Sequence, residues 1–279
     1  MDGAQDSIEE LAAKVDLLKR EVDALQIANM ANKRPWYKDI PTIIASLALM
    51  FSFGTTYVSY TRTQAQDIQN SRAELRSLLQ RLAALPKENL ELTNKYAQDA
   101  NNSGYLSSLI LQEGTLLAQQ AAEIIDRLPP DQVTAIEYYA VGDGLRNSGD
   151  NTQAIDMFLK AIDAATEMNT EVSAWREYAA LLFETGQPDA GRDAFSKALT
   201  IFSKYPGYSE YVQKSTHILT EMGWAQNETT IGSLDLAMEH LVNADALAYW
   251  LDPGPYTDRL KQQIEQTKRT VMSSDDWYQ

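Results

Sequence analysis

The sequence predicts an all-α protein, because three observations agree along its 279 residues. Apolar residues recur at spacings of three and four, the period of an amphipathic helix, and no stretch alternates convincingly with the period of two of a half-buried strand. Glycine, proline and short polar residues interrupt this pattern at intervals. One run of 22 residues contains no charged side chain. We therefore expect a short coiled coil, one transmembrane helix, a helical stalk and then antiparallel helix pairs joined by short turns.

The N-terminal segment, residues 1–39, contains a heptad stripe within residues 7–30. β-Branched residues alternate with leucine in the order that favours a parallel two-stranded coil, and an asparagine in such a position sets register. Helices of this length are marginal in isolation, so the alternative is a single amphipathic helix that packs on the membrane or on another protein. The stripe consists of Ile8, Leu11, Val15, Leu18, Val22, Leu25 and Asn29.

Residues 40–61 form the uncharged run, which spans about 33 Å as a helix and so exceeds the roughly 30 Å hydrocarbon core of a bilayer. Trp36 and Tyr37 precede it, and Tyr57 and Tyr60 lie near its end, where aromatic rings favour the membrane interfaces. The run begins after 39 residues and is longer than the apolar region of a signal peptide. We predict a retained transmembrane helix, with a buried core helix of a soluble domain as the alternative.

Flanking charges predict the orientation of this span. Lys33, Arg34 and Lys38 lie within seven residues before it, whereas Arg62 alone lies within seven residues after it. The more basic flank tends to remain cytoplasmic. We expect a single-pass protein of the bacterial inner membrane, with a cytoplasmic N-terminus and a periplasmic C-terminal domain. The alternative is the reverse topology, with the C-terminal domain in the cytoplasm.

A second heptad stripe occupies residues 62–86, which we interpret as a helical stalk. The stripe ends at Pro86, where a helix should end because proline lacks the backbone donor. Together with residues 7–30, it predicts a parallel homo-oligomer that passes through the bilayer. The stripe consists of Ile68, Ser71, Leu75, Leu78, Leu82 and Leu85.

Two helix pairs within residues 87–279 match each other at a constant shift of 37 residues. Small residues recur where helices would cross closely, and a large aromatic residue lies between them. The matched residues are Tyr138, Gly142, Leu145, Gly149, Ala154, Phe158 and Ala161 in the first pair, and Trp175, Ala179, Leu182, Gly186, Gly191, Phe195 and Ala198 in the second. This pattern resembles the tetratricopeptide repeat family. The resemblance is clearest over residues 135–205, with a third unit expected at about 208–247, and it implies a superhelical solenoid.

In that family the first helices of the repeats line a concave groove that holds a peptide or a partner helix. The resemblance therefore implies a protein-binding groove at Ile136, Tyr139, Asp143, Arg146, Asn147, Ser173, Arg176, Ala180, Phe183 and Glu184. Tyr139 and Asp143 occupy positions where a clamp for chaperone C-termini carries Lys and Asn, which disfavours a chaperone co-receptor. We predict that Phe158 and Phe195 are packing residues and not ligand contacts.

Composition and motifs limit the chemistry. The absence of cysteine excludes disulfides, thiolate metal sites and a cysteine nucleophile, and a net charge of −15 makes nucleic acid an unfavourable partner. His217 and His240 lack the spacing of helical metal ligands, and we interpret Glu221, four residues after His217, as a helix-surface pair. We expect no cofactor, metal or catalytic site.

The sequence therefore predicts a membrane-anchored adaptor that binds proteins and that contacts the lipid bilayer through residues 40–61. The alternative of another class is a helical enzyme that uses surface carboxylates, for example to cleave glycans; no single carboxylate is distinguished by its sequence context.

Overall fold

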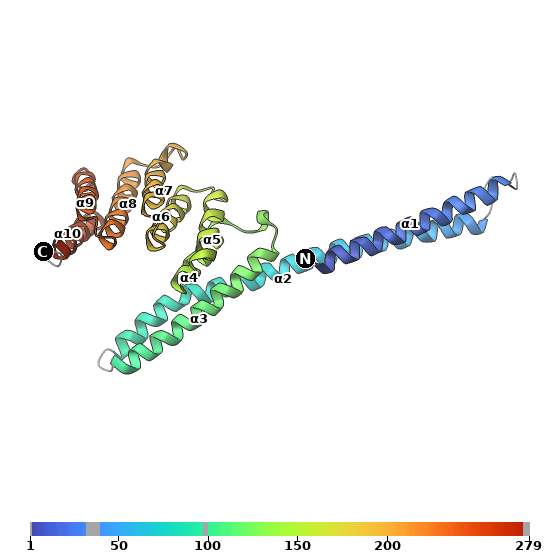
Figure 1. Ribbon diagram of the computed structural model, residues 1–279, viewed down its shortest axis with the longest axis horizontal. Helices are drawn as coiled ribbons and strands as arrows, with labels where there is room; N and C mark the ends of the chain where they lie inside the picture. Colours follow the sequence, from blue (N-terminus) through green and yellow to red (C-terminus); the bar gives the residue numbers. More distant parts are fainter. Residues whose placement is uncertain (1, 32–39, 97–99, 276–279) are drawn as a thin grey trace. The chain divides into compact units, whose positions relative to one another are not determined.

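The computed structural model describes residues 2–31, 40–96 and 100–275, and these residues form helices and turns without a strand (Figure 1). The predicted all-α class is confirmed. The helices are α1 (Asp2–Ala31), α2 (Ile40–Lys95), α3 (Ala100–Arg127), α4 (Ala135–Asn147), α5 (Asn151–Asp163), α6 (Met168–Glu184), α7 (Pro188–Thr200), α8 (Glu210–Thr230), α9 (Leu234–Tyr249) and α10 (Pro255–Asp275), with single 3₁₀ turns at Pro130–Gln132 and Ile201–Ser203.

The chain divides into an N-terminal unit, Met1–Ile68, and a C-terminal unit, Gln69–Gln279. The N-terminal unit contains α1 and the first part of α2. That part of α2 is long and apolar enough to cross a membrane, with a mean hydropathy of 1.4 over its most apolar window and none of that window buried. Phe51, for example, has 78% of its surface exposed.

Several predicted features of the N-terminal unit lie outside the described residues. These are the interfacial Trp36 and Tyr37 and the basic flank of Lys33, Arg34 and Lys38. The side chains of Ile8, Leu11 and Asn29 in the first heptad stripe are likewise not described. Of the remaining stripe, Val15 and Val22 are exposed, so the coiled coil stays a prediction.

Helix α2 does not end at Pro86, and the expectation that it would do so is wrong. It continues to Lys95 because contacts with α3 hold it on both sides of the proline. Before Pro86, Leu85 packs on Gly114, where an added Cβ would lie 3.3 Å from Leu85 Cδ1. After it, Ser107 Oγ donates a hydrogen bond of 2.9 Å to Asn89 Oδ1. Tertiary packing thus offsets the free-energy cost of the backbone hydrogen bond that proline removes.

Arg81 adds an electrostatic link at the same place. Its guanidinium donates to Glu113 of α3, with Nε 2.6 Å from Oε1, and also to Glu88, which follows Pro86 in α2. These hydrogen bonds raise the pKa of Arg81 and lower that of Glu113. The two helices are therefore joined across the proline by charge as well as by apolar contact.

The second heptad stripe also differs from its predicted role. Leu75 is fully buried and Leu85 nearly so, within a single chain. Leu82 lies near Gly144 of α4, and an added Cβ there would approach Ala118 of α3 to 2.9 Å. Residues 69–86 therefore contribute Leu75 and Leu85 to the core of the C-terminal unit, and no second copy is needed to cover these two side chains.

Helix boundaries in the C-terminal unit follow local chemistry. Helix α4 begins with a capping box in which the backbone N–H of Thr134 donates to Glu137 Oε2 at 2.8 Å. Asp150 caps α5 and Ser209 caps α8, each accepting a hydrogen bond from a backbone N–H of the first turn. Pro188 occupies the first turn of α7, where its missing N–H costs nothing.

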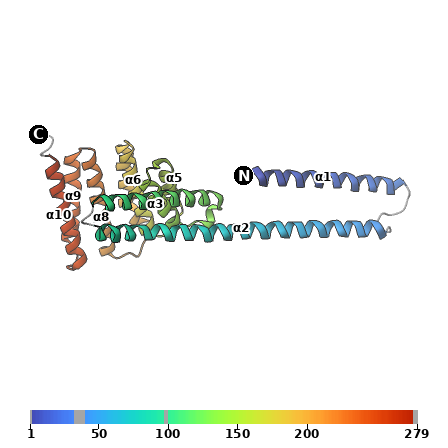
Figure 2. The ribbon, with the colours of Figure 1, turned by 90° about the horizontal axis from the view of Figure 1, so that it is seen from below.

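Three helix pairs, α4/α5, α6/α7 and α8/α9, follow one another in the C-terminal unit (Figure 1, Figure 2). Their turns share one backbone geometry. The turn glycines, Gly149, Gly186 and Gly232, have φ values of 84°, 77° and 80°, a region that favours glycine. In each turn the N–H of the following residue bonds the carbonyl five residues back, at 3.0, 2.8 and 2.9 Å, which is the Schellman cap. The third pair lies in the range expected for a third unit.

Small residues bring the paired helices together. An added Cβ at Gly142 would lie 2.9 Å from Phe158, and one at Gly191 would lie 2.5 Å from Phe183. Phe158 and Phe195 have 0% and 1% of their surfaces exposed, so their predicted burial is confirmed. In the third pair Leu241, also fully buried, takes the place of the aromatic residue.

Replacing Phe195 with alanine should lower the free energy of unfolding by about 3–5 kcal/mol, because the ring is buried among α6, α7 and α8 and stacks on Trp224. Leu159→Ala, at an exposed position of α5, should change it by less than about 0.5 kcal/mol. Urea unfolding of the full chain in detergent, followed by circular dichroism, measures both. Equal effects of the two substitutions would contradict the packing described above.

Candidate functional site

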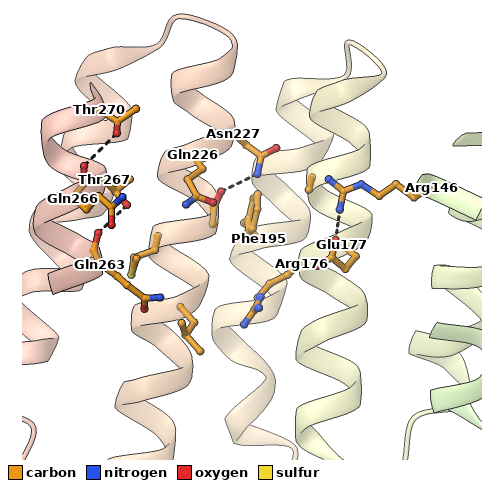
Figure 3. A pocket seen from close by; sticks show the side chains of 14 residues that line it. Arg146, Arg176, Glu177, Phe195, Gln226, Asn227, Gln263, Gln266, Thr267 and Thr270 are labelled. Carbon is orange, nitrogen blue, oxygen red and sulfur yellow. Dashed lines mark hydrogen bonds and ion pairs between the residues drawn. The ribbon is translucent and has the colours of Figure 1, made fainter. Parts of the chain in front are cut away.

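A polar groove of about 580 Å³ lies between the first helices of the repeated pairs and α10 (Figure 3). Helices α4 and α6 supply its charged residues, α8 and α10 supply carboxamides and hydroxyls, and the edge of Phe195 from α7 contributes to its wall. The principal lining residues are Arg146, Arg176, Glu177, Gln226, Asn227, Gln263, Gln266 and Thr267.

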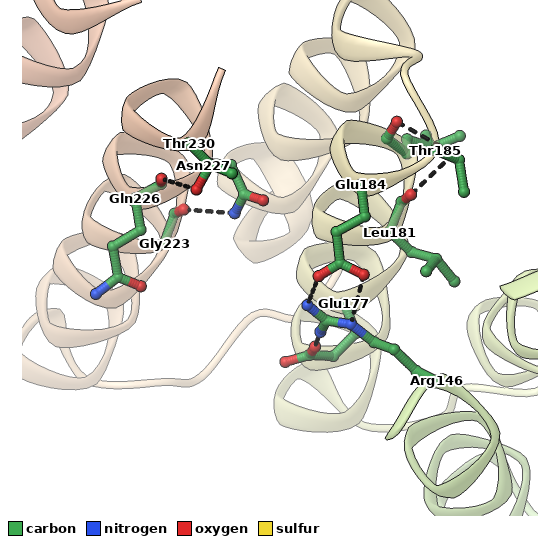
Figure 4. A network of polar contacts seen from close by, with 10 residues as sticks. Arg146, Glu177, Leu181, Glu184, Thr185, Gly223, Gln226, Asn227 and Thr230 are labelled. Atoms are coloured by element: carbon green, nitrogen blue, oxygen red, sulfur yellow. Dashed lines mark hydrogen bonds and ion pairs between the residues drawn. The ribbon is translucent and has the colours of Figure 1, made fainter. Parts of the chain in front are cut away.

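The carboxamides give this groove hydrogen-bonding capacity without charge. Each can donate two hydrogen bonds and accept two. Asn227 uses one donor on the carbonyl of Gly223, at 2.8 Å (Figure 4). Side chains of this kind match the alternating N–H and C=O groups of an extended peptide backbone.

Arg146 joins α4 to α6 at one side of the groove. Its guanidinium pairs with both Glu177 and Glu184 (Figure 4). Burial tends to lower the pKa of Arg146, but the two carboxylates outweigh that effect and raise it. Burial also raises the pKa of Glu177, which the guanidinium only partly counters. The sequence indicated Arg146 and Glu184 as separate groove residues, whereas in the structure they pair with each other.

Arg176 differs from Arg146 because it forms no hydrogen bond or ion pair with the rest of the described chain. It is half-buried on α6 and lines the polar groove. Its guanidinium is therefore available to a ligand. Planar guanidinium groups favour carboxylates and carbonyl oxygens.

A second cavity of about 530 Å³, the apolar groove, lies between α2, α3 and α4. Burial, aided by the charges of Glu177 and Asp143, raises the pKa of Tyr139 in this groove to about 12, so its hydroxyl stays protonated. Ile136 remains 58% exposed. The principal lining residues are Leu79, Leu82, Ala83, Pro86, Ile110, Leu111, Ile136, Tyr139, Asp143 and Asn147.

The predicted groove residues are thus divided between two cavities. The residues from α4 line the apolar groove, except Arg146, which lines the polar groove with Arg176 and Ala180. Glu184 lies at the surface in its pair with Arg146, and Ser173 lines neither cavity.

Phe183 is not a groove residue, contrary to the prediction. It has 4% of its surface exposed and lies against Gly191, with its ring centroid 6.1 Å from that of Phe195. The absence of a side chain at Gly191 makes room for the ring between α6 and α7. The repeat resemblance placed this position in the groove, because the spacing of repeat positions does not show the room that Gly191 leaves for the ring.

Sequence reasoning also missed a buried charged network between α7, α8 and α9. Glu228 is fully buried and receives two hydrogen bonds from Arg192, at 2.7 and 2.8 Å, and one from Trp224 Nε1 at 3.0 Å. The Trp224 ring stacks on Phe195 on one side and on His240 on the other, with centroid distances of 5.5 and 3.9 Å.

Glu221 belongs to this network, and its interpretation as a surface partner of His217 is wrong. Glu221 is buried, and its Oε2 lies 2.6 Å from Nδ1 of His240 in the next helix. The pair is separated by 19 residues in sequence, so no helical spacing rule could indicate it. His217 instead packs edge-on against Phe202.

The carboxylates of this network are paired within the chain. Within the described parts of the chain, no three histidine or acidic side chains are grouped so that they could hold a metal ion. Each buried carboxylate of the network already has a neighbouring donor: Glu228 has Arg192, and Glu221 has His240. The two grooves, in contrast, contain groups with unused hydrogen-bonding or charge capacity, and they are the better candidates for a functional site.

Comparisons with known proteins do not identify a family. No protein-family model matches the sequence, and no curated protein matches it. Among solved structures, the chain is similar to BtubC (BKLC) from P. vanneervenii at 12% identity, over 72% of this chain and 92% of that chain. The TM-score is 0.38, a likeness too low to support an argument about fold or function.

Replacing Glu228 with glutamine should destabilise the protein at pH 7, because it removes the charge that pairs with Arg192. Burial raises the pKa of Glu228, but the hydrogen bonds from Arg192 and Trp224 outweigh it, so the folded pKa lies below the usual 4.5. The carboxylate therefore stabilises the fold above pH 4.5, and this contribution is lost as the pH falls through the folded pKa.

The stability difference between wild type and Glu228→Gln should accordingly shrink below pH 4.5. Urea unfolding at a series of pH values measures it, with the exposed Glu239→Gln as control. A difference that stays constant over the whole series would show that Glu228 is not held ionised by these contacts.

Proposed function

We propose that this protein is a membrane-anchored scaffold of the bacterial cell envelope, whose C-terminal unit binds segments of other proteins. The observation that carries the proposal is the polar groove, in which helices from successive pairs present carboxamides and an unpaired Arg176 toward one cavity. Its volume lies in the range of about 300–1,000 Å³ that is usual for ligand-binding cavities.

The proposed architecture is a tetratricopeptide-like solenoid, clearest over residues 135–205. Three features support it: the glycine turn that recurs three times, the small residues at the close helix contacts, and the large buried residue between them. Since residues 69–86 pack into the same core, the proposed repeat domain begins before residue 87.

The proposed ligand of the polar groove is an extended peptide segment. Its main chain would exchange hydrogen bonds with Gln226 and Asn227 of α8 and with Gln263 and Gln266 of α10 (Figure 3). A carboxylate or carbonyl of the segment would meet Arg176. The described side chains already provide a rigid frame, because the Arg146 ion pairs hold α4 against α6.

The anchor of the proposed scaffold is the segment 40–61 of α2. Its exposed apolar side chains and its length support insertion in a bilayer. The basic residues before it support a cytoplasmic N-terminus and a periplasmic C-terminal unit. Parallel association through residues 7–30 is part of the proposal, and the exposed Val15 and Val22 supply its seam.

Replacing Leu49 with arginine should hinder membrane insertion, because a charge at the centre of a span costs about 2.5–3.5 kcal/mol on translocon scales. Alkaline carbonate washing of membranes, followed by detection of the full chain in pellet and supernatant, measures the effect. Leu49→Ile serves as the control. Release of the unmodified chain into the supernatant would disprove the anchor.

The reverse orientation, a cytoplasmic adaptor on the same anchor, is the second candidate. Arg72, Arg76 and Arg81 follow the span at a greater distance and reduce the charge asymmetry that supports the first. A reporter that fluoresces only in the cytoplasm, fused after Gln279, separates the two. Absence of fluorescence supports a periplasmic C-terminal domain, and bright fluorescence supports the cytoplasmic adaptor.

Replacing Arg176 with alanine should weaken partner binding about 10-fold or more, equivalent to about 1.4 kcal/mol, without lowering the melting temperature. The reason is that its guanidinium bonds no other described residue. Arg259→Ala, at an exposed position of α10, is the matched control. Quantitative crosslinking in intact cells from a photoreactive residue at position 226 measures capture. Equal crosslinking yields from both variants would argue against ligand binding in the polar groove.

A further inference from the structure

The apolar groove differs from the polar groove in the state of its hydrogen-bonding groups. Its uncharged polar side chains are largely engaged within the chain: Ser107 bonds Asn89 at 2.9 Å, Thr115 bonds the carbonyl of Leu111 at 2.9 Å, and Ser148 bonds that of Leu145 at 2.7 Å. An extended peptide in this groove would leave its own N–H and C=O groups without partners. A helix satisfies these groups internally.

The surface of this groove suits apolar side chains. Leu79 and Leu82 from α2, Ile110 and Leu111 from α3, and Ile136 from α4 line it. Leu111 and Ile136 have 54% and 58% of their surfaces exposed, so these large apolar groups face water in the isolated chain. Burial of such a surface by a partner is favourable at roughly 25 cal/mol per Å².

Asp143 is the single formally charged residue that lines this groove in the described structure. It is half-buried, and its described hydrogen bond comes from Asn147 Nδ2 at 3.3 Å. Arg146 is close enough to act on it electrostatically, but its guanidinium is held by Glu177 and Glu184. Burial raises the pKa of Asp143, which shows the cost of leaving this carboxylate without a direct cation.

We propose that the apolar groove binds an amphipathic helix of a partner protein that inserts apolar side chains between α2, α3 and α4 and pairs one lysine or arginine with Asp143. Because the carboxylate lies beside an apolar wall, a matching ligand needs apolar side chains and one cation, and the net charge of −15 attracts a cationic helix. The inference rests on the proposed scaffold function and specifies the partner for its second groove.

The test uses a display library of 16-residue helical peptides, randomised on one face, selected on the detergent-solubilised full chain. Enriched peptides should carry apolar residues at spacings of three and four, with a lysine or arginine at one recurring position. Ile136→Glu should abolish their binding. In parallel selections Asp143→Asn should remove the preference for the cation, and Asp163→Asn, at an exposed position of α5, should keep it.

A double-substitution cycle then measures the pair directly. Changing the recurring lysine of one peptide to glutamine should weaken binding to the unmodified protein at least 10-fold, and to Asp143→Asn less than 2-fold, by fluorescence anisotropy. The change on the peptide tests the pair even if a protein variant folds poorly. Equal losses with both proteins would overturn the inference.

The outcomes separate this inference from the proposed function. Peptides that are enriched without a cation, or whose binding is lost in Arg176→Ala but not in Ile136→Glu, overturn the inference and leave the scaffold function standing. A selection that enriches no helical peptide overturns the inference, whereas the scaffold function is tested separately by the crosslinking of Arg176→Ala.

Discussion

Close approach of paired helices is the constraint on which the C-terminal unit depends. Gly142 and Gly191 lie where a single added carbon would collide with the rings of Phe158 and Phe183. Each ring fills the space that the missing side chain leaves, so the same contact sets the distance between the paired helices and buries the ring. Because the turn glycines repeat the same backbone geometry, each pair presents its first helix in a similar way.

Charge pairs between successive helix pairs act on this packed frame. Arg146 connects α4 to α6 through two carboxylates, and Arg192 connects α7 to α8 through the buried Glu228. Removing one member of a buried pair leaves an uncompensated charge, which is costly. Apolar contacts therefore hold the two helices of each pair together, and apolar and ionic contacts hold successive pairs together. The same contacts fix the helices that line the grooves.

The two grooves differ in what a ligand must bring. In the polar groove, carboxamides and Arg176 would supply hydrogen bonds to the proposed extended segment, whose backbone N–H and C=O groups are unsatisfied. In the apolar groove, engaged hydroxyls and exposed aliphatic side chains favour a segment whose backbone is already satisfied. Asp143 and Arg176 are opposite charges on neighbouring helices, and neither has an ion pair within the described chain. Under the proposed function, this difference would let the two grooves discriminate between two kinds of partner segment.

Local pattern in the sequence was sufficient for the helical class, the length of the apolar span, the register of the repeated pairs and the burial of Phe158 and Phe195. Each of these depends on periodicity or spacing within one or two helices. The tertiary structure decided the continuation of α2 past Pro86, the burial of Leu75, the core position of Phe183 and the Glu221–His240 contact. It also divided the predicted groove residues between two cavities. These features depend on neighbours that are remote in sequence, such as α3 for Pro86 and α9 for Glu221. Contacts of this kind stabilise the fold without leaving a periodic pattern in the sequence.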